Sequence, residues 1–349
     1  MKVSAILKRN LISMMRIDRI LCPVNVPLEF DEAVRCAASL AAVYRAKLTI
    51  CHCLASSPLF EVPGAGARVG VIRKELEDAL RRYLGPSFSQ MAELVVVDSG
   101  KDIGDQIVNT ARDGSVDLIV MRSRQSRVAA LLGSTAEQVS RTASCPVLVI
   151  HPREQQDGGS NERPEVERLL ICHDFSSSAE LALSYGLSMA QKYGAELHVI
   201  HVLPEQMQDG PERGQGQTGD DTAYHRAARR LRDAIPEEVY KRRSVTLIVR
   251  WGKPYREVLA YAREQEMDLV CMGALGRDFG LEALFGSNVD RVLRQSPCPV
   301  LIARPLKLAP PLSLVSAAEP SFKKTLFFPT TLVTGAICIL QCSNGLLIG

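Results

Sequence analysis

The sequence has almost no excess of charge of either sign. Its 349 residues contain 42 Lys and Arg against 39 Asp and Glu, which gives a net charge of +3 at pH 7. Aromatic residues make up only 5% of the chain, and the basic residues form no stripe interleaved with them. Proteins that bind nucleic acid need a concentrated basic surface. We therefore expect no nucleic-acid partner.

Long uninterrupted apolar runs are also missing at both ends. Lys8 and Arg9 interrupt the apolar residues of the N-terminus, which argues against a secretory signal peptide and predicts a cytoplasmic protein. Residues 325–349 hold no charged residue, and a segment of that length could span a bilayer. Pro329 and Gly335 break its apolar run, however. This pattern favours an irregular tail, or one folded onto the domains or a partner, over a membrane anchor.

Cysteine spacing typical of a metal site is absent, although the chain has ten cysteines. Most lie in apolar, strand-like runs, which indicates reduced thiols buried as small hydrophobic residues. Cys51-His52-Cys53 has the residue types of a metal site. On a strand, however, its two cysteines share one face and His52 takes the other. No second cluster completes it, so no metal site is expected.

The phosphate-loop pattern G-x4-G-K-[ST] does not occur. Gly100-Lys101 and Gly252-Lys253 lack the upstream glycine and are followed by Asp and Pro. Both pairs follow the third predicted strand of their half. We therefore expect these glycines to serve turns.

What the chain does contain is an internal repeat. Val116–Met121 recurs as Met267–Met272, and Ser144–Val149 recurs as Pro297–Ile302. A period of about 150 residues indicates a duplicated domain rather than a solenoid. The boundaries that this predicts are a first domain at 16–152, a linker at 153–167, a second domain at 168–305 and a C-terminal tail at 306–349.

Each half alternates short apolar runs with amphipathic stretches. In the first half, apolar runs at Ile20–Val24, Leu48–Leu54 and Leu118–Met121 alternate with helical patterns such as Ile103–Arg112. Five such runs predict a parallel sheet with helices on both faces. The predicted fold class is α/β, with two tandem, doubly wound, Rossmann-like domains. Ligands of such sheets bind at the carboxyl ends of strands, here beside the loops after the first and fourth strands.

One segment of the second half, from Asp268 to Arg304, predicts an anion site. The apolar run Leu269–Met272 has the length of a buried strand and is followed by Gly273 and Gly276. A helical pattern then opens at Gly286-Ser287-Asn288. A glycine-bearing loop that leads into a helix presents unpaired N–H groups and the positive end of the helix dipole. Phosphate is the ligand that this arrangement favours.

On these residues, the second half resembles a universal stress protein domain of the UspA type. The family's ATP-binding members share G-x2-G-x9-G-[ST], which Gly273, Gly276 and Gly286-Ser287 match. Asp174 matches the Asp that ends the family's first strand, and His201-Val202 matches the end of its second strand. Both halves match the closing Pro-Val-Leu strand, so the chain resembles a tandem member of the family. The resemblance implies an adenine nucleotide alpha hydrolase-like sheet with strand order 3-2-1-4-5.

The resemblance also implies a role for each matched residue. Without side chains, Gly273 and Gly276 would let phosphate oxygens approach the backbone, and Gly286-Ser287-Asn288 would offer amide N–H groups and a hydroxyl. Asp174 would face the adenosine moiety, and Val202 would form an apolar wall near the base. The complete predicted site is Asp174, Val202, Met272, Gly273, Gly276, Arg277, Gly286, Ser287 and Asn288.

The implied ligand is ATP or another adenine nucleotide, which could carry Mg²⁺. Arg277, beside the glycines, either contacts a phosphate or faces solvent. The first half departs from the pattern: Arg122 and Gln125 replace the glycines, and Asn25 replaces the acidic residue. Only seven residues separate Gln125 from Gly133. We predict one nucleotide site per chain, with the first domain kept as a structural copy, or binding a different anion as the alternative.

The sequence offers no evident general base. His52 and His201 end equivalent strands, so we expect structural roles for them. His173 precedes Asp174, but neighbouring strand residues point to opposite faces of a sheet. Without a base, a nucleophile or an acidic pair for Mg²⁺, efficient hydrolysis is not expected.

Three function classes follow, and a regulatory nucleotide-binding module of the stress response is the favoured one. The alternatives are a slow ATP hydrolase and a non-nucleotide scaffold, which could be membrane-associated through the tail. The resemblance implies that Val147–Ile150 and Val300–Ala303 pair the two halves, and a homodimer is possible.

Overall fold

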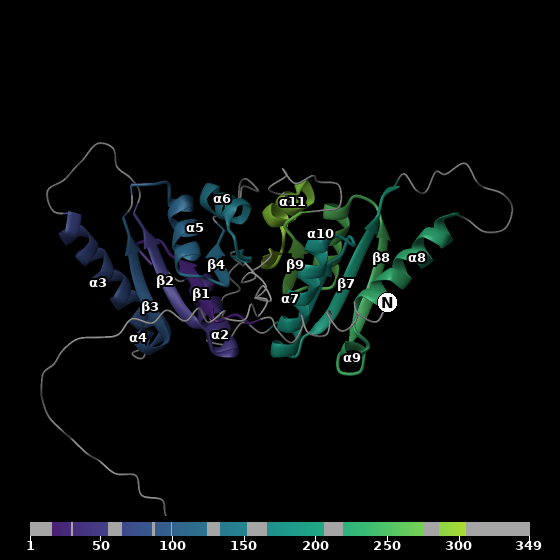
Figure 1. The fold of residues 1–349 in the computed structure, drawn as a ribbon, viewed down its shortest axis with the longest axis horizontal. Coiled ribbons are helices and arrows are strands. Elements are labelled where there is room, and N and C mark those ends of the chain that lie inside the picture. Colours follow the sequence, from purple (N-terminus) through teal and green to yellow (C-terminus); the bar gives the residue numbers. More distant parts are fainter. Residues whose placement is uncertain are drawn as a thin grey trace, which may run out of the picture. The chain divides into compact units, whose positions relative to one another are not determined.

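The computed structural model describes residues 16–28, 31–54, 65–85, 88–98, 100–123, 133–151, 166–205, 219–275 and 286–304. Figure 1 shows the alternation of strands and helices in both halves. The elements of the first domain are β1 (Arg19–Pro23), α2 (Glu32–Tyr44), β2 (Lys47–Cys53), α3 (Ala65–Leu84), α4 (Phe88–Met91), β3 (Ala92–Val97), α5 (Ile103–Asp113), β4 (Leu118–Arg122), α6 (Ser134–Thr142) and β5 (Val147–Ile150). Those of the second are β6 (Arg168–Cys172), α7 (Ser177–Tyr193), β7 (Glu196–Leu203), α8 (Gly219–Ala234), α9 (Glu237–Tyr240), β8 (Val245–Trp251), α10 (Pro254–Glu264), β9 (Leu269–Gly273), α11 (Ser287–Gln295) and β10 (Val300–Ala303).

The strands form one continuous sheet in the order β3-β2-β1-β4-β5-β10-β9-β6-β7-β8. Within each half every pairing is parallel and the order is 3-2-1-4-5, which confirms the predicted fold class. At the junction β5 and β10 run antiparallel, with Leu148 opposite Leu301. The predicted pairing of the two closing strands is confirmed.

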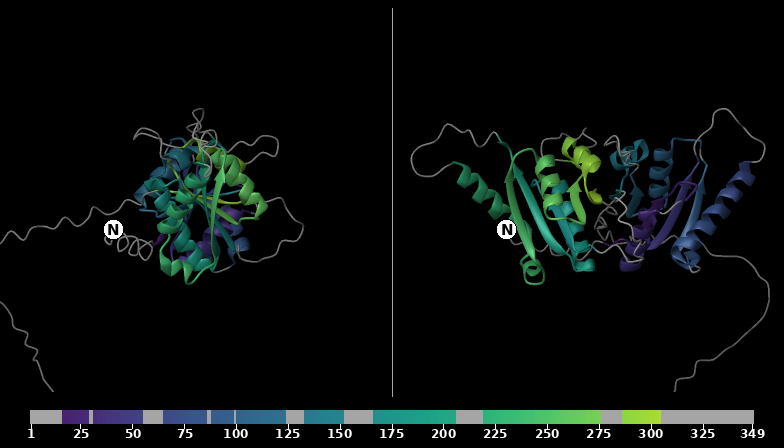
Figure 2. Two further views of the ribbon diagram at one scale, coloured as in Figure 1. Left: turned by 90° about the vertical axis from the view of Figure 1, so that its right-hand side faces the viewer. Right: turned by 180° about the vertical axis from the view of Figure 1, so that it is seen from behind.

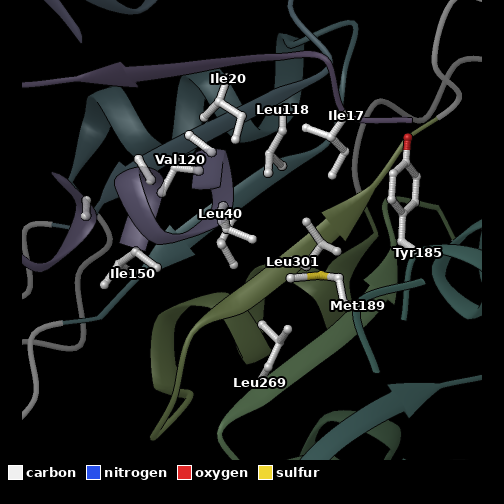
Figure 3. Packing of buried hydrophobic residues seen from close by; sticks show 14 of the residues in the cluster. Ile17, Ile20, Leu40, Leu118, Val120, Ile150, Tyr185, Met189, Leu269 and Leu301 are labelled. Carbon is white, nitrogen blue, oxygen red and sulfur yellow. The ribbon is translucent and has the colours of Figure 1, made fainter. Parts of the chain in front are cut away.

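Two hydrophobic clusters cover the two faces of this sheet. Helices α2, α3, α7 and α8 pack on one face, and α5, α6, α10 and α11 on the other. Strand residues alternate between them, so that Ile20 faces the first cluster and Leu21 the second. Burial on both faces explains why the strands are continuously apolar. In Figure 3, Leu40 and Ile150 lie in the same cluster as Leu269 and Leu301, so this core crosses the domain junction.

Four charged side chains join α6 to α11 beside the junction. Arg294 lies 2.6 Å from Glu137, and Arg141 lies 3.3 Å from Asp290. Within each helix the same residues form i,i+4 pairs. Hydrogen bonds from Arg294 to Asp290 and then to Glu137 raise the pKa of its guanidinium. Figures 1 and 2 show the two helices next to each other.

The two domains also cap each other's helices. Arg304, which follows β10, donates to the carbonyl oxygens of Ser140 and Arg141 at 2.6 and 2.7 Å, at the C-terminal end of α6. His151, which follows β5, donates from Nε2 to the carbonyl oxygen of Leu293 in α11 at 2.7 Å. The last carbonyls of a helix have no partner within it. Each domain thus supplies donors to the other's helix end.

The structure tests the sequence predictions for two glycine turns and for the cysteines. Gly100 and Gly252 have φ angles of 66° and 141°, so the predicted turns require glycine there. The Sγ atoms of Cys51 and Cys53 are 3.7 Å apart on one face of β2, as expected. No disulfide joins any of the eight described cysteines, and six of them are buried. Within the described residues, no cluster of side chains could hold a metal ion.

Other predictions fall outside the described residues. These are the conformation of the tail at 306–349, nearly all of the linker at 153–167, and Gln125. Among the helices in the described ranges, none is both long and apolar enough to cross a membrane.

Candidate functional site

A cavity of about 420 Å³ lies at the carboxyl ends of β6, β7 and β9 in the second domain. The first turns of α10 and α11 complete its lining. It therefore lies beside the loops after the first and fourth strands of this half, where the strand order reverses. Its volume falls within the range of ligand pockets, roughly 300–1,000 Å³.

Six of the nine predicted site residues line this cavity. Ser287, the first residue of α11, is exposed and does not line it. Gly276 and Arg277 lie outside the described residues. The six lining residues are Asp174, Val202, Met272, Gly273, Gly286 and Asn288.

The loop after β6 holds Asp174 in a defined position. The Oδ1 atom of Asp174 accepts the N–H of Ser176 at 3.0 Å, and the Ser176 hydroxyl accepts the N–H of Ala179 to cap α7. Between them, Phe175 has a φ of 64°, a left-handed conformation that is rare for a bulky residue. Its ring packs 4.5 Å from that of His201, and the Arg230 guanidinium lies 3.8 Å from its centroid. These contacts hold the strained loop beside the cavity.

His52 and His201 have the same structural role in the two domains. The Nδ1 atom of His201 donates to the carbonyl oxygen of His173 at 2.7 Å. That of His52 donates to the carbonyl oxygen of Val24 at 2.9 Å. Each ring ties the second strand to the loop after the first, as a structural role requires. His201 also lines the cavity, so an exclusively structural role stays a prediction for it.

The strand alternation expected for His173 and Asp174 does not apply, because β6 ends at Cys172. Both residues line the cavity. His173 is buried, and its Nδ1 accepts the N–H of Phe175 at 3.2 Å, which leaves the proton of the neutral ring on Nε2.

The structure gives a reason for glycine at position 273 that the sequence did not suggest. A Cβ atom here would lie 2.6 Å from the carbonyl carbon of Ser178, in the first turn of α7. This residue must therefore be glycine so that the end of β9 can approach α7. A close approach of phosphate to the same backbone stays a prediction.

Two helices begin at the cavity without a side-chain cap. The N-cap of α11 is Gly286, and that of α10 is Lys253, followed by Pro254 in the first turn. Neither cap residue accepts a backbone N–H through its side chain, unlike Ser176 of α7. The first turns of α10 and α11 thus keep donors and the positive ends of their dipoles near the cavity.

Helix α10 contributes Pro254, Tyr255 and Val258 to the cavity wall, and none of these residues was predicted from the sequence. Tyr255 is half-buried, and its hydroxyl accepts from Nε of Arg256 at 3.0 Å. This hydrogen bond, with the positive charges of Arg256 and Arg291 beside it, lowers the pKa of Tyr255. Val258 also belongs to the hydrophobic cluster between α10 and the sheet, and no local pattern of the sequence indicates that the start of this helix borders a ligand site.

Residues 16–151 and 165–304 each match the model of the universal stress protein family. The chain belongs to this family. A family member from Mycolicibacterium smegmatis is 26% identical over 297 residues, covering 82% of this chain and 97% of that protein. A second, from Mycobacterium tuberculosis, is 25% identical over 295 residues, covering 80% and 95%. The tandem arrangement is thus present in full.

A solved family structure from Archaeoglobus fulgidus has the same fold. It aligns with a TM-score of 0.57 at 20% sequence identity, over 83% of this chain and 99% of that one.

Proposed function

We propose that this universal stress protein binds an adenine nucleotide in the cavity of its second domain and acts as a regulatory module of the stress response. The observation that carries the proposal is the convergence of three features on one cavity. These are the loop after β6, the end of β9 and the uncapped start of α11. The family's ATP-binding glycine pattern ends at this helix start.

The chemistry of the lining matches the two ends of a nucleotide. Val202, Met272 and Val289 offer apolar surface for a base. Asp174 places a carboxylate beside them, suited to ribose hydroxyls. Gly286 and Asn288 lie at the start of α11, where N–H groups would donate to phosphate oxygens. Among the described lining residues Asp174 is the one carboxylate, so Mg²⁺ would enter bound to the phosphates.

Calorimetric titration with ATP, together with mass spectrometry of the ligand that co-purifies, tests this proposal. Val202→Trp would fill the apolar end of the cavity and should weaken ATP roughly tenfold or more, as a steric penalty of about 1–3 kcal/mol does. Val71→Trp is the matched control, because Val71 is 68% exposed on α3 in the other domain. If wild-type protein neither carries nor binds an adenine nucleotide, the proposal is wrong and a scaffold role takes its place.

The same titration distinguishes binding from turnover. ADP that accumulates with ATP, faster than in a Val202→Trp sample, would identify the slow ATP hydrolase instead. Our proposal expects ATP to be recovered intact over the time of the measurement.

A further inference from the structure

A compact basic and aromatic cluster lies at the edge of the cavity and was not part of the predicted site. Tyr255 lines the cavity, while Arg256 and Arg291 are exposed beside it. The Arg291 guanidinium, from α11, lies 4.5 Å from the centroid of the Tyr255 ring, and Arg256 bonds the Tyr255 hydroxyl. No carboxylate of the described residues forms an ion pair with either arginine. Their charges are thus not neutralised by the described part of the chain.

The first domain provides an internal comparison, because α5 and α10 occupy equivalent places in the repeat. The second and third residues are Gly104 and Asp105 in α5, and Tyr255 and Arg256 in α10. The N-cap residue of α5 is Asp102, whose carboxylate accepts the N–H of Gly104 at 2.8 Å. In α10 the N-cap is a lysine, whose side chain accepts no N–H, and the acidic residue of that first turn, Glu257, lies 3.6 Å from Arg250.

The partner helices α6 and α11 both begin at a glycine N-cap without a side-chain cap, and they differ in charge instead. Their fifth residues are Gln138 and Arg291. Gln138 packs over Gly104 and donates to Asp105 at 3.0 Å, so the first domain closes this place with an amide and a carboxylate. Across these matched positions the first domain carries two negative charges. The second carries three positive charges, on Lys253, Arg256 and Arg291.

The difference in charge coincides with the difference in the glycine pattern. The domain with the pattern has the positive, uncapped start of α10, and the domain without it has the negative, capped start of α5. A structural requirement of the fold alone would apply to both copies. A requirement of the ligand applies only to the copy that binds it.

We propose that Tyr255, Arg256 and Arg291 form a subsite for the terminal phosphates of a nucleoside polyphosphate. This inference rests on the proposed function and adds a specificity to it. Tyr255 holds the two guanidinium groups at the cavity edge through its hydroxyl and its ring, and they donate to phosphate oxygens beyond the start of α11. The protein would thereby prefer nucleoside di- and triphosphates to monophosphates.

The test measures by calorimetry the affinities of the wild-type protein and of two variants for ATP, ADP, AMP and cyclic AMP. The first variant is Arg291→Gln, which introduces the residue type that the first domain has at the matched position, Gln138. Arg256→Gln is the second variant. Arg81→Gln removes the same charge from an exposed position of α3 and serves as the control. We expect both cluster variants to weaken ATP roughly tenfold. The affinity for AMP should change less than about twofold, and Arg81→Gln should alter the affinity for neither ligand.

Each outcome has a distinct meaning. If the wild type binds ATP and AMP equally, or if Arg291→Gln and Arg256→Gln weaken both to the same extent, the subsite is wrong while the proposed nucleotide site stands. A loss of ATP affinity in Arg81→Gln equal to that in the cluster variants would show a general charge effect and would also overturn it. Absence of any nucleotide binding by the wild type would instead overturn the proposed function.

Discussion

At the scale of single residues, the absence of a side chain at Gly273 has two explanations, room for phosphate and close packing against α7. The sequence suggested only the first of them. The glycine pattern of the family suggested that the missing side chain makes room for phosphate. In the structure the backbone of Ser178 already occupies the space that a Cβ would need. A substitution at Gly273 would therefore disturb packing as well as any ligand, and variants elsewhere test the ligand more cleanly.

Gly273→Ala should lower the free energy of unfolding by about 1–3 kcal/mol, because α7 must shift away from the new methyl group. Denaturant unfolding of the two proteins measures this change. Gly70→Ala is the control: Gly70 lies exposed within α3 and its Cβ would meet nothing within 4 Å. That substitution should stabilise the protein by about 0.5–1 kcal/mol. Equal effects of the two substitutions would contradict the packing argument.

His151 should make stability fall in mild acid. Burial lowers the pKa of His151 below its usual value near 6.5. Between the folded and unfolded pKa values the unfolded chain binds more protons, so stability is complete above about pH 6.5 and is lost as the pH falls toward the folded pKa. Urea unfolding between pH 8 and pH 5 should show a steeper decline for the wild type than for His151→Gln. Parallel curves would exclude His151 as the cause.

At the scale of elements, the nine residues of α11 both border the cavity and contact the first domain. Its first turn borders the cavity through Gly286 and Asn288. Its last turns carry Arg294, which pairs with Glu137 of α6, and the Leu293 carbonyl, which His151 caps. The helix that would receive the phosphates is thus also a helix that joins the domains.

A double-mutant cycle on Glu137→Gln and Arg294→Gln measures this link. Both side chains are about a quarter exposed, at 30% and 21%, and belong to a four-charge network. We expect a coupling free energy of about 1 kcal/mol in denaturant unfolding, at the upper end for exposed pairs. The pair Lys47 and Glu93, both more than half exposed, should give less. A coupling within error of zero for the α6–α11 pair would show that packing alone holds the helices together.

At the scale of the whole molecule, the two domains share one sheet and two hydrophobic clusters. They differ at the positions predicted to bind the nucleotide, where only the second domain has the family's residues. Asn25 and Arg122 of the first domain are exposed at the strand ends that correspond to Asp174 and Gly273. The pKa of the neighbouring Asp31 is raised by burial, an effect that the Arg122 charge partly offsets.

Calorimetric titration should therefore reach saturation at one ATP per chain. Two equivalents would show that the first domain binds as well. Val202→Trp should then weaken one of the two equivalents roughly tenfold or more and leave the other unchanged, which identifies the domain responsible for each.

The local patterns of the sequence determined the larger part of the fold. Apolar runs such as Leu269–Met272 and the repeat period depend on which residues avoid water, and that property is local. The duplicated α/β sheet followed from them. The family resemblance added the pairing of β5 with β10, which the structure confirms. It also named nine candidate site residues, six of which line the cavity and whose binding role stays a prediction.

The tertiary structure alone decided which loops and helix starts meet. Crossover geometry brings Tyr255 of α10 against Arg291 of α11, residues that no sequence period links. The direction of His173 depends on where β6 ends, and the need for glycine at Gly273 depends on how closely α7 approaches β9. Periodicity states which face of an element is buried. Only packing in three dimensions states what lies against it.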